Sequence, residues 1–337
     1  MDTDSVLQPV FIFAFAAVEL LINLICVPVS AINFFLVAKS SVIHPNLKHI
    51  LIYQSGCILG RGMCRFTTCL LKFVQLSPLA SESFQSIGTI YSFFIFERNT
   101  MAHVLIIERV LATVTAKSYE RRRKPFFTLG WLIIVISLGL FNAIGYRENG
   151  LSIVLTNYAL LFSAGIELCV FSLLRWHSEK AYFRTLHSSN GHNLSERYQL
   201  SENVRIGKQL VPTLVFHLFN IMSSTLITNW SLFTLPGYDY MLVFCSMLSS
   251  FCSLMIEISI IMCHPFLKRE FTHIMNRFGI GSSSRSIRVA VAENGMINGL
   301  NNGGGQKIAM TNILNGEALV IEQKQEAHFE MLRKLWK

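Results

Sequence analysis

FQSIGTIYSFFIFERNTMAHVLIIERVLATVTAKSYERRRK, residues 84–124, is an apolar stretch that two charged pairs interrupt and a basic cluster ends. Residues 84–112 are long enough to cross a bilayer, which needs roughly 20 residues at about 1.5 Å each. The charged pairs are Glu97-Arg98 and Glu108-Arg109. Charges inside a membrane are costly unless protein surrounds them. We therefore expect this helix to lie inside a bundle, with other membrane spans packed around it.

The composition of the chain indicates a membrane protein. Of its 337 residues, 52% are hydrophobic and 15% are charged, against about 25% charged in a typical soluble domain. Apolar runs this long and this numerous argue against buried helices of a soluble core. The net charge of +9 does not predict nucleic-acid binding, because the basic residues gather on one side of the predicted spans.

Hydropathy and turn residues predict an all-α membrane protein, a bundle of seven transmembrane helices. The predicted spans are 10–37, 47–73, 84–112, 126–144, 151–174, 209–233 and 240–263. A polar segment, 175–208, separates the fifth span from the sixth. The chain then divides into a membrane domain, 1–278, and a cytoplasmic tail, 279–337.

The region after the seventh span contains two predicted elements. Residues 264–278 have the pattern of an amphipathic helix that lies in the inner membrane interface. The start of the tail, 279–305, is rich in Gly, Asn and Ser and is expected to be disordered. Residues 307–337 have helical character and are expected to form a helix that folds when it docks.

The distribution of lysine and arginine predicts the orientation. With the amino terminus outside, the inner loops receive most of the basic residues, including the cluster at 121–124 and those of 175–208. The outer side receives only Lys72 and Arg147. The tail is therefore expected inside.

No motif predicts catalysis, a metal site or a cofactor. The eight cysteines lie in or at the ends of apolar runs, without the spacing of metal ligands, and are expected to be buried apolar residues. No nucleophile elbow, zinc motif or Walker loop is present. We therefore do not expect an enzyme.

Seven charged residues within the spans are candidates for a buried polar network, because an isolated charge in hydrocarbon costs at least about 2.5–3.5 kcal/mol. They are Glu19, Arg61, Arg65, Glu97, Arg98, Glu167 and Glu257. One interpretation is a network below a ligand site that switches between two pairings. The other is a static network that fixes the register of the helices.

Glu108 and Arg109 stand at the inner end of the third span. An acid beside an arginine at this position resembles the switch of rhodopsin-like receptors, in which Glu108 would hold Arg109 at rest and Arg109 would meet a G protein on opening. The alternative is an arginine that extends to lipid headgroups. Other features of those receptors are missing, since no Asn-Pro-x-x-Tyr ends the seventh span and no Trp-x-Pro lies in the sixth.

Four short motifs, in order along the chain, resemble those of nematode serpentine chemoreceptors of the Sra superfamily. The resemblance is greatest to the alpha/beta class, with the epsilon class second. The motifs are HPNLK at 44–48, ERVLAT at 108–113 followed by Tyr119 and Glu120, RYQLSEN at 197–203, and HPFLK at 264–268.

This resemblance implies a seven-helix G-protein-coupled receptor of sensory cilia in the plasma membrane, which responds to an environmental or pheromone-like small molecule. Its partners would be a heterotrimeric G protein, through Glu108, Arg109, Tyr119 and Glu120, and membrane lipid. Candidate pocket residues in the outer halves of the spans are Tyr91, Phe94, Tyr158, Asn229 and Trp230. The alternative is a seven-span channel or transporter that uses the intramembrane charges as a permeation path.

Overall fold

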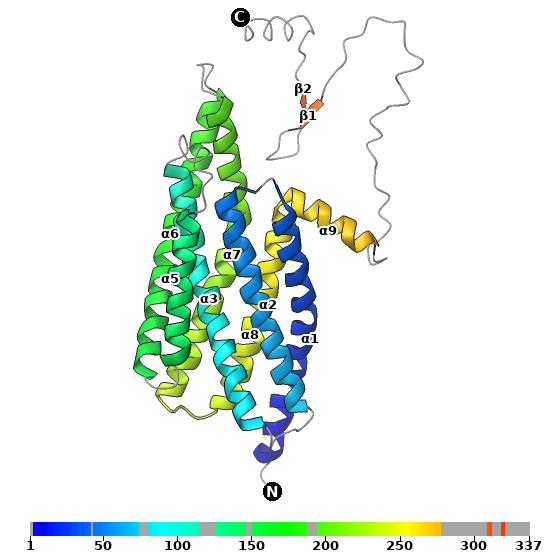
Figure 1. Ribbon diagram of the computed structural model, residues 1–337, viewed down its shortest axis with the longest axis vertical. Coiled ribbons are helices and arrows are strands. Elements are labelled where there is room, and N and C mark those ends of the chain that lie inside the picture. The colour runs from blue at the N-terminus through cyan, green and yellow to red at the C-terminus, as the bar shows by residue number, and fades with distance from the viewer. Residues whose placement is uncertain are drawn as a thin grey trace, which may run out of the picture. The chain divides into compact units, whose positions relative to one another are not determined.

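The computed structural model describes residues 3–41, 43–73, 80–114, 126–145, 150–187, 194–277, 309–311 and 318–320. The chain forms two compact units, Met1–Met275 and Asn276–Lys337. Within these described residues, long helices make up the first unit (Figure 1). They are α1 (Thr3–Lys39), α2 (Pro45–Phe73), α3 (Ala80–Val114), α5 (Phe126–Gly145), α6 (Gly150–His187), α7 (Leu194–Leu232) and α8 (Tyr238–Cys263), followed by the short α9 (Pro265–Arg277).

The helices of the first unit pack as a closed ring with α5 outside it. Around the ring, α1 contacts α2 and α8, α2 contacts α3, α3 contacts α6 and α7, and α7 packs between α6 and α8. Helix α5 contacts α3, α6 and α2. As expected for a helix inside the bundle, α3 has neighbours on several sides, and its segment from Phe96 to Glu108 is mostly buried.

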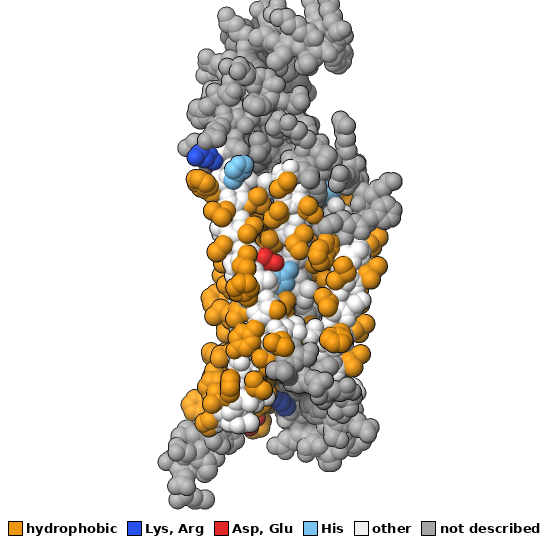
Figure 2. All heavy atoms as spheres, turned by 90° about the vertical axis from the view of Figure 1, so that its left-hand side faces the viewer, with side chains coloured by type: hydrophobic (Ala, Val, Ile, Leu, Met, Phe, Trp, Pro, Cys, Tyr) orange, Lys and Arg blue, Asp and Glu red, His pale blue; other side chains and the backbone are white. Residues whose placement is uncertain are grey.

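The bundle is apolar on the outside and partly polar on the inside. Figure 2 shows a face covered largely by hydrophobic side chains, interrupted near its middle by acidic and histidine atoms. Large apolar side chains such as Phe35, Ile133 and Phe162 are exposed, whereas Glu19 and Arg98 are buried. This arrangement is unfavourable in water and favourable in a membrane, because apolar side chains that face lipid carry no solvation cost and charged side chains are kept out of the hydrocarbon.

Four segments of the described helices are long and apolar enough, by length and composition, to cross a membrane. They are Val10–Lys39, Ile153–Lys180, Leu210–Leu232 and Tyr238–Cys263, and Thr128–Ile144 is a shorter apolar helix. Helices α2 and α3 have the length of a span, but they carry four charged residues of the predicted network, which are Arg61, Arg65, Glu97 and Arg98.

The two halves of the bundle differ in what they bury. The main apolar core lies toward the end where α1 ends, α2 begins and α9 packs, and it includes Leu51, Leu105 and Ile260. The other half, which contains the start of α1, holds the polar cluster around Glu19 and Arg65. This ion pair is thus separated from the apolar core.

The two His-Pro motifs are the starts of two helices. Pro45 and Pro265 are the first residues of α2 and α9, a position where proline loses no hydrogen bond. The carbonyl of His44 accepts from the amide of Lys48, and that of His264 from the amide of Lys268, both at 2.9 Å. The local chemistry of these motifs therefore explains where the chain re-enters a helix.

Helices α6 and α7 are longer than the sequence predicted. The polar segment expected at 175–208 continues α6 to His187 and begins α7 at Leu194. The prediction used hydropathy to end each span, but Glu, Lys, Arg and Gln are good helix formers and extend a helix beyond its apolar part. The polar segment between the two predicted spans is therefore helical over these described residues.

Helix α9 confirms the predicted amphipathic segment but uses its apolar face differently. Leu267 is buried in the core of the bundle, and Phe266, Phe271 and Ile274 pack against that core. Phe278, the last residue of the predicted segment, lies outside the described residues. The same apolar period suits a membrane interface or a protein core, and here the described residues contact the core.

The described part of the second unit is a pair of short strands. Strand β1 (Ala309–Thr311) pairs antiparallel with β2 (Ala318–Val320), with Met310 opposite Leu319. The helix predicted from residue 307 onward is therefore not formed at these positions. The rest of the predicted tail helix lies outside the described residues.

Candidate functional site

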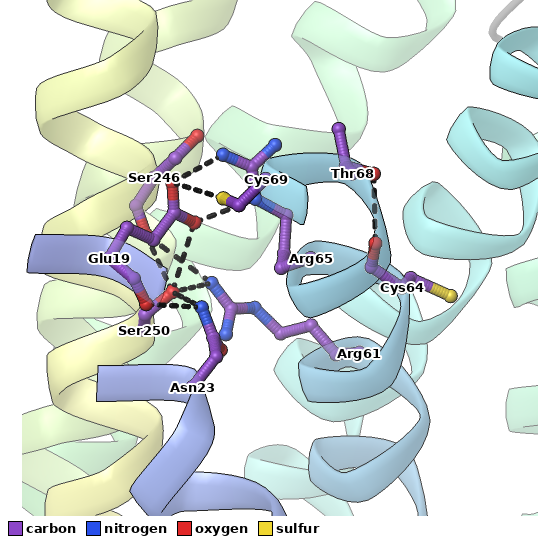
Figure 3. A network of polar contacts seen from close by, with 9 residues as sticks. All are labelled: Glu19, Asn23, Arg61, Cys64, Arg65, Thr68, Cys69, Ser246 and Ser250. Carbon is purple, nitrogen blue, oxygen red and sulfur yellow. Dashed lines mark hydrogen bonds and ion pairs between the residues drawn. The ribbon is translucent and has the colours of Figure 1, made fainter. Parts of the chain in front are cut away.

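Glu19 of α1 and Arg65 of α2 form a bidentate ion pair inside the bundle. Nε of Arg65 donates to Oε1 of Glu19 at 2.7 Å, and Nη2 donates to Oε2 at 2.5 Å. Ser250 of α8 donates to the same carboxylate at 3.2 Å. The pair therefore joins α1, α2 and α8, and Figure 3 shows α2 extending both Arg61 and Arg65 toward these two helices.

Arg61 lies one turn before Arg65 and has fewer partners. Its side chain is 0% exposed. Nη2 donates to Oγ of Ser250 at 3.1 Å and to the carbonyl of Ser246 at 3.4 Å, while Nε and Nη1 have no hydrogen-bond partner among the described residues. The ring of Tyr91 lies 5.8 Å from the Arg61 guanidinium and 5.3 Å from that of Arg65.

Arg98 of α3 is also 0% exposed, and its contacts are to neutral groups. Nη1 donates to Oγ of Ser253 at 2.8 Å and of Ser249 at 3.2 Å. Nε and Nη2 donate to Oδ1 of Asn99 at 3.3 Å and 3.0 Å. Ser249 in turn donates to Asn220 of α7 at 2.8 Å. Arg98 thus links α3 to α8 and, through Ser249, to α7.

Glu97 of α3 and Glu167 of α6 each have a partner other than Arg98. The hydroxyl of Tyr53 in α2 donates to Oε2 of Glu97 at 2.6 Å. Oε2 of Glu167 in α6 lies 2.5 Å from Nδ1 of His103. Neither acid contacts Arg98, so the charged pair Glu97-Arg98 of the sequence is not an ion pair in the structure. For Glu97 the reason is the direction of its side chain, because neighbouring residues of a helix point about 100° apart.

Glu257 of α8 is held by neutral side chains of two other helices. Ser55 of α2 donates to its Oε2 at 3.1 Å, and the amide of Asn33 in α1 donates to the same oxygen. The amide of Asn33 also donates to Ser55 at 3.2 Å. The seven predicted charges are therefore buried or partly buried in the bundle, but they form several separate clusters and not one network.

Glu108 and Arg109 form the contact expected at the end of α3. Nε of Arg109 lies 2.5 Å from Oε2 of Glu108, and Nη2 lies 2.6 Å from Oε1. Both side chains are buried, so Arg109 does not extend to lipid headgroups in this conformation. Tyr119 and Glu120, which the resemblance added to this region, lie outside the described residues.

The five candidate pocket residues do not form one cluster. Tyr91 faces the arginines, whereas the ring of Phe94 fills the space beside Gly60 of α2. Tyr158 is 48% exposed and donates to Asn229 across α6 and α7 at 2.9 Å. Trp230 donates to the carbonyl of Pro236 in the following turn at 3.1 Å. Of the five, Tyr91 is the one in contact with the buried charges.

The most informative residues missed from the sequence are serines of α8. The set Ser246, Ser249, Ser250 and Ser253 contacts Arg61 or Arg98. Their spacing of three and four residues places them on one face of a helix, which was a readable signal. His103, Asn99 and Asn220 were missed because a single polar residue in an apolar run does not reveal its partner.

The described residues contain no group of three or more His, Cys, Asp or Glu side chains that would hold a metal ion. Hydroxyl, amide and guanidinium donors predominate around Arg61 and Arg98. This chemistry suits recognition of polar or negatively charged groups by hydrogen bonding.

Comparison with known proteins gives a family. A sequence model described as "Sre G protein-coupled chemoreceptor" matches residues 22–301. Among curated relatives, serpentine receptor class epsilon-8 of Caenorhabditis elegans is 31% identical over 195 residues, covering 55% of this chain and 56% of the relative. Serpentine receptor class epsilon-13 is 23% identical over 182 residues, covering 52% and 49%.

Serpentine receptor class alpha/beta-14 of the same nematode is 32% identical over 130 residues, covering 34% of this chain and 33% of the relative. The chain thus matches about a third to a half of the length of these relatives. The resemblance to nematode serpentine chemoreceptors is confirmed, and the family match is to the epsilon class, which the sequence motifs placed second. This protein, a multi-pass membrane protein by its apolar helices and its relatives, belongs to the Sre G protein-coupled chemoreceptor family.

Proposed function

We propose that this chain is a chemosensory receptor with seven membrane spans that binds a small molecule and activates a heterotrimeric G protein. The spans would be α1, α2, α3, α5, α6, α7 and α8, with the amino terminus outside and the tail inside. Family membership and the bundle of long helices support this proposal, together with the lysine and arginine bias of the loops.

The observation that carries the coupling proposal is the bidentate contact between Glu108 and Arg109. This buried pair lies near the end of α3, in the half of the bundle that contains the apolar core and α9. In the proposed orientation that end faces the cytosol. Glu108 restrains Arg109 at rest, and opening of the inner face releases the arginine to a G protein.

The ligand site is proposed for the opposite half, where α1 begins and the polar cluster lies. Tyr91 and Arg98 belong to α3 and Arg61 to α2, and both arginines contact α8. A ligand there acts by population shift, because it binds one arrangement of these helices more tightly than the other. Phe94, Tyr158, Asn229 and Trp230 remain proposed pocket residues, although their observed contacts are separate.

The family suggests a sensory role, and we extend it to an environmental or pheromone-like ligand, the plasma membrane and the sensory cilium. Tyr119, Glu120 and the basic cluster at 121–124 follow the end of α3, so the proposed G-protein surface includes them. Lys268 and Arg269 of α9 are exposed, and in the proposed orientation they would contact the anionic lipid of the inner leaflet.

A channel or transporter is less well supported by the same charges. Glu19, Glu108 and Glu167 each contact a basic side chain directly. The charged residues within the spans lie in several separate clusters, and separate clusters do not line a continuous path for ions. The receptor proposal needs no such path.

The test measures nucleotide exchange on a co-expressed heterotrimeric G protein, in membranes with the receptor and in matched membranes without it. Receptor-dependent exchange supports the proposal. Ion currents that persist without any G protein, with no effect on exchange, would favour the channel. An epitope placed after Lys337 should be labelled only when the cells are permeabilised, and labelling of intact cells would reverse the orientation.

A further inference from the structure

Arg61 and Arg98 are two buried cations without a matching anion. Both side chains are 0% exposed. Their partners are serine hydroxyls, a backbone carbonyl and the side chain of Asn99. Among the residues that the structure describes, no carboxylate lies within ion-pair distance of either guanidinium. The nearest ion pair, Glu19 with Arg65, already uses both carboxylate oxygens on its own arginine.

Leaving these two cations unpaired is costly, and arginine cannot escape the cost by losing its proton. The guanidinium group stays charged in proteins, whereas a buried carboxyl group can become neutral. This difference separates the arginines from the buried acids Glu97 and Glu257, whose neutral partners also suit a protonated carboxyl group. An uncompensated buried charge is among the most destabilising features of a fold, so a counter-ion is expected at the arginines.

The two arginines contact neighbouring serines of the same helix. Arg61 contacts Ser246 and Ser250, and Arg98 contacts Ser249 and Ser253. These serines lie along one face of α8 over about 10 Å, at 1.5 Å per residue. Both guanidinium groups therefore approach the same short stretch of one helix.

Hydrogen-bond donors without acceptors surround this stretch. Nε and Nη1 of Arg61 have no partner in the described part of the chain. The same holds for the side-chain nitrogens of Asn99 and Asn220, whose oxygens are already used by Arg98 and Ser249. A carboxylate has two oxygens and about four acceptor positions, and it would supply what these donors lack.

We propose that Arg61 and Arg98 bind the carboxylate of a small organic acid, so that the receptor's ligand is an anion. This proposal rests on the proposed function, because it names the ligand class of the same site. Arg98 supplies charge from α3 and Arg61 from α2, while the serines of α8 complete the hydrogen bonds. Tyr91, over Arg61 and Arg65, closes one side of the cluster.

The test follows thermal unfolding of the purified full-length receptor in detergent by tryptophan fluorescence. The probes are acetate, butanoate, hexanoate and octanoate, each compared with the primary amide of the same chain and with chloride at equal ionic strength. At least one acid should raise the unfolding midpoint, while its amide and chloride should not. No G protein is present, so failure of coupling and failure of this proposal are distinguishable.

Variants locate the effect. Arg98→Gln and Arg61→Gln should each raise the half-saturating concentration of the stabilising acid about tenfold or more, because hydrogen bonds to charged groups are the stronger ones. Arg175→Gln is the matched control, since this partly exposed arginine of α6 pairs with Glu179, and it should leave the concentration unchanged.

Equal stabilisation by acids and amides would overturn the proposal, as would stabilisation by chloride alone, which would indicate a site for an inorganic anion. An unchanged half-saturating concentration in both arginine variants would place the acid elsewhere and also contradict it. If a variant does not fold, the unfolding midpoints of the native receptor with the acid and with its amide still test the proposal, because this comparison needs no substitution.

Discussion

Glu97 and Arg98 are neighbours in α3, but they do not pair with each other. Oε2 of Glu97 accepts from the hydroxyl of Tyr53 in α2 at 2.6 Å, while Nη1 of Arg98 donates to Ser253 in α8 at 2.8 Å. The two side chains connect α3 to different helices. Substitutions at the two positions should therefore have separate effects.

Glu97→Gln should change stability little. The amide oxygen of glutamine can still accept from Tyr53, and Arg98 loses no partner because Glu97 is not one of its contacts. We expect a change in unfolding free energy within about 1.5 kcal/mol, the range of one neutral hydrogen bond. Thermal unfolding in detergent measures it. A loss of about 3–5 kcal/mol, the usual result of breaking a buried ion pair, would mean that Glu97 and Arg98 do pair.

Arg65→Gln and Glu19→Gln should each destabilise the bundle by about 3–5 kcal/mol, because each leaves the other charge buried alone. The double variant should be less destabilised than the sum of the two, since it removes both charges. Surface delivery and the unfolding midpoint, measured for all three, give the coupling between the residues. Additive losses would show that the bidentate contact contributes nothing.

Gly60→Ala should be destabilising although alanine is the better helix former. A Cβ at Gly60 would lie within 3.0 Å of the ring of Phe94, so α2 and α3 must separate or the ring must move. Overpacking of this kind costs about 1–3 kcal/mol. The matched control is Gly130→Ala in α5, where a Cβ meets nothing within 4 Å. There the substitution should raise the free energy of unfolding by about 0.5–1 kcal/mol. Equal effects of the two substitutions on the unfolding midpoint would contradict the close contact between Gly60 and Phe94.

Much of the architecture was predictable because it depends on properties that are periodic along the chain. Apolar runs located the long helices, and the His-Pro motifs marked the starts of α2 and α9. The charge of Glu19 and Arg65 indicated burial inside a bundle, since such residues cannot face lipid. These features are local, and local features can be read without knowing the partners of a helix.

Pairing in space could not be predicted in the same way. Glu97 and Arg98 are adjacent in the sequence, but the rotation of successive residues about the helix axis directs them to different neighbouring helices. The serines of α8 became visible as partners only when α2, α3 and α8 were placed together. The extension of α7 back to Leu194 was missed because hydropathy detects where a helix is apolar and not where it ends.

Glu108→Gln should raise the basal activity of the receptor. The substitution removes the negative charge that holds Arg109, so the inner face opens more often without ligand. A weakening of the closed state by about 1.4 kcal/mol would increase the open population about tenfold. Basal nucleotide exchange per receptor at the surface measures this change. Basal exchange at or below the native level would show that Glu108 does not restrain the resting state.

The remaining measurement is nucleotide exchange on the co-expressed G protein for Arg109→Ala, normalised to receptor at the surface. Lys72→Ala is its matched control, because this exposed cation lies at the other end of the bundle, at the end of α2. We expect Arg109→Ala to reduce receptor-dependent exchange to the level of membranes without receptor, while surface delivery is preserved and Lys72→Ala exchanges like the native chain. Native-like exchange by Arg109→Ala, at matched surface level, would contradict the proposed mechanism.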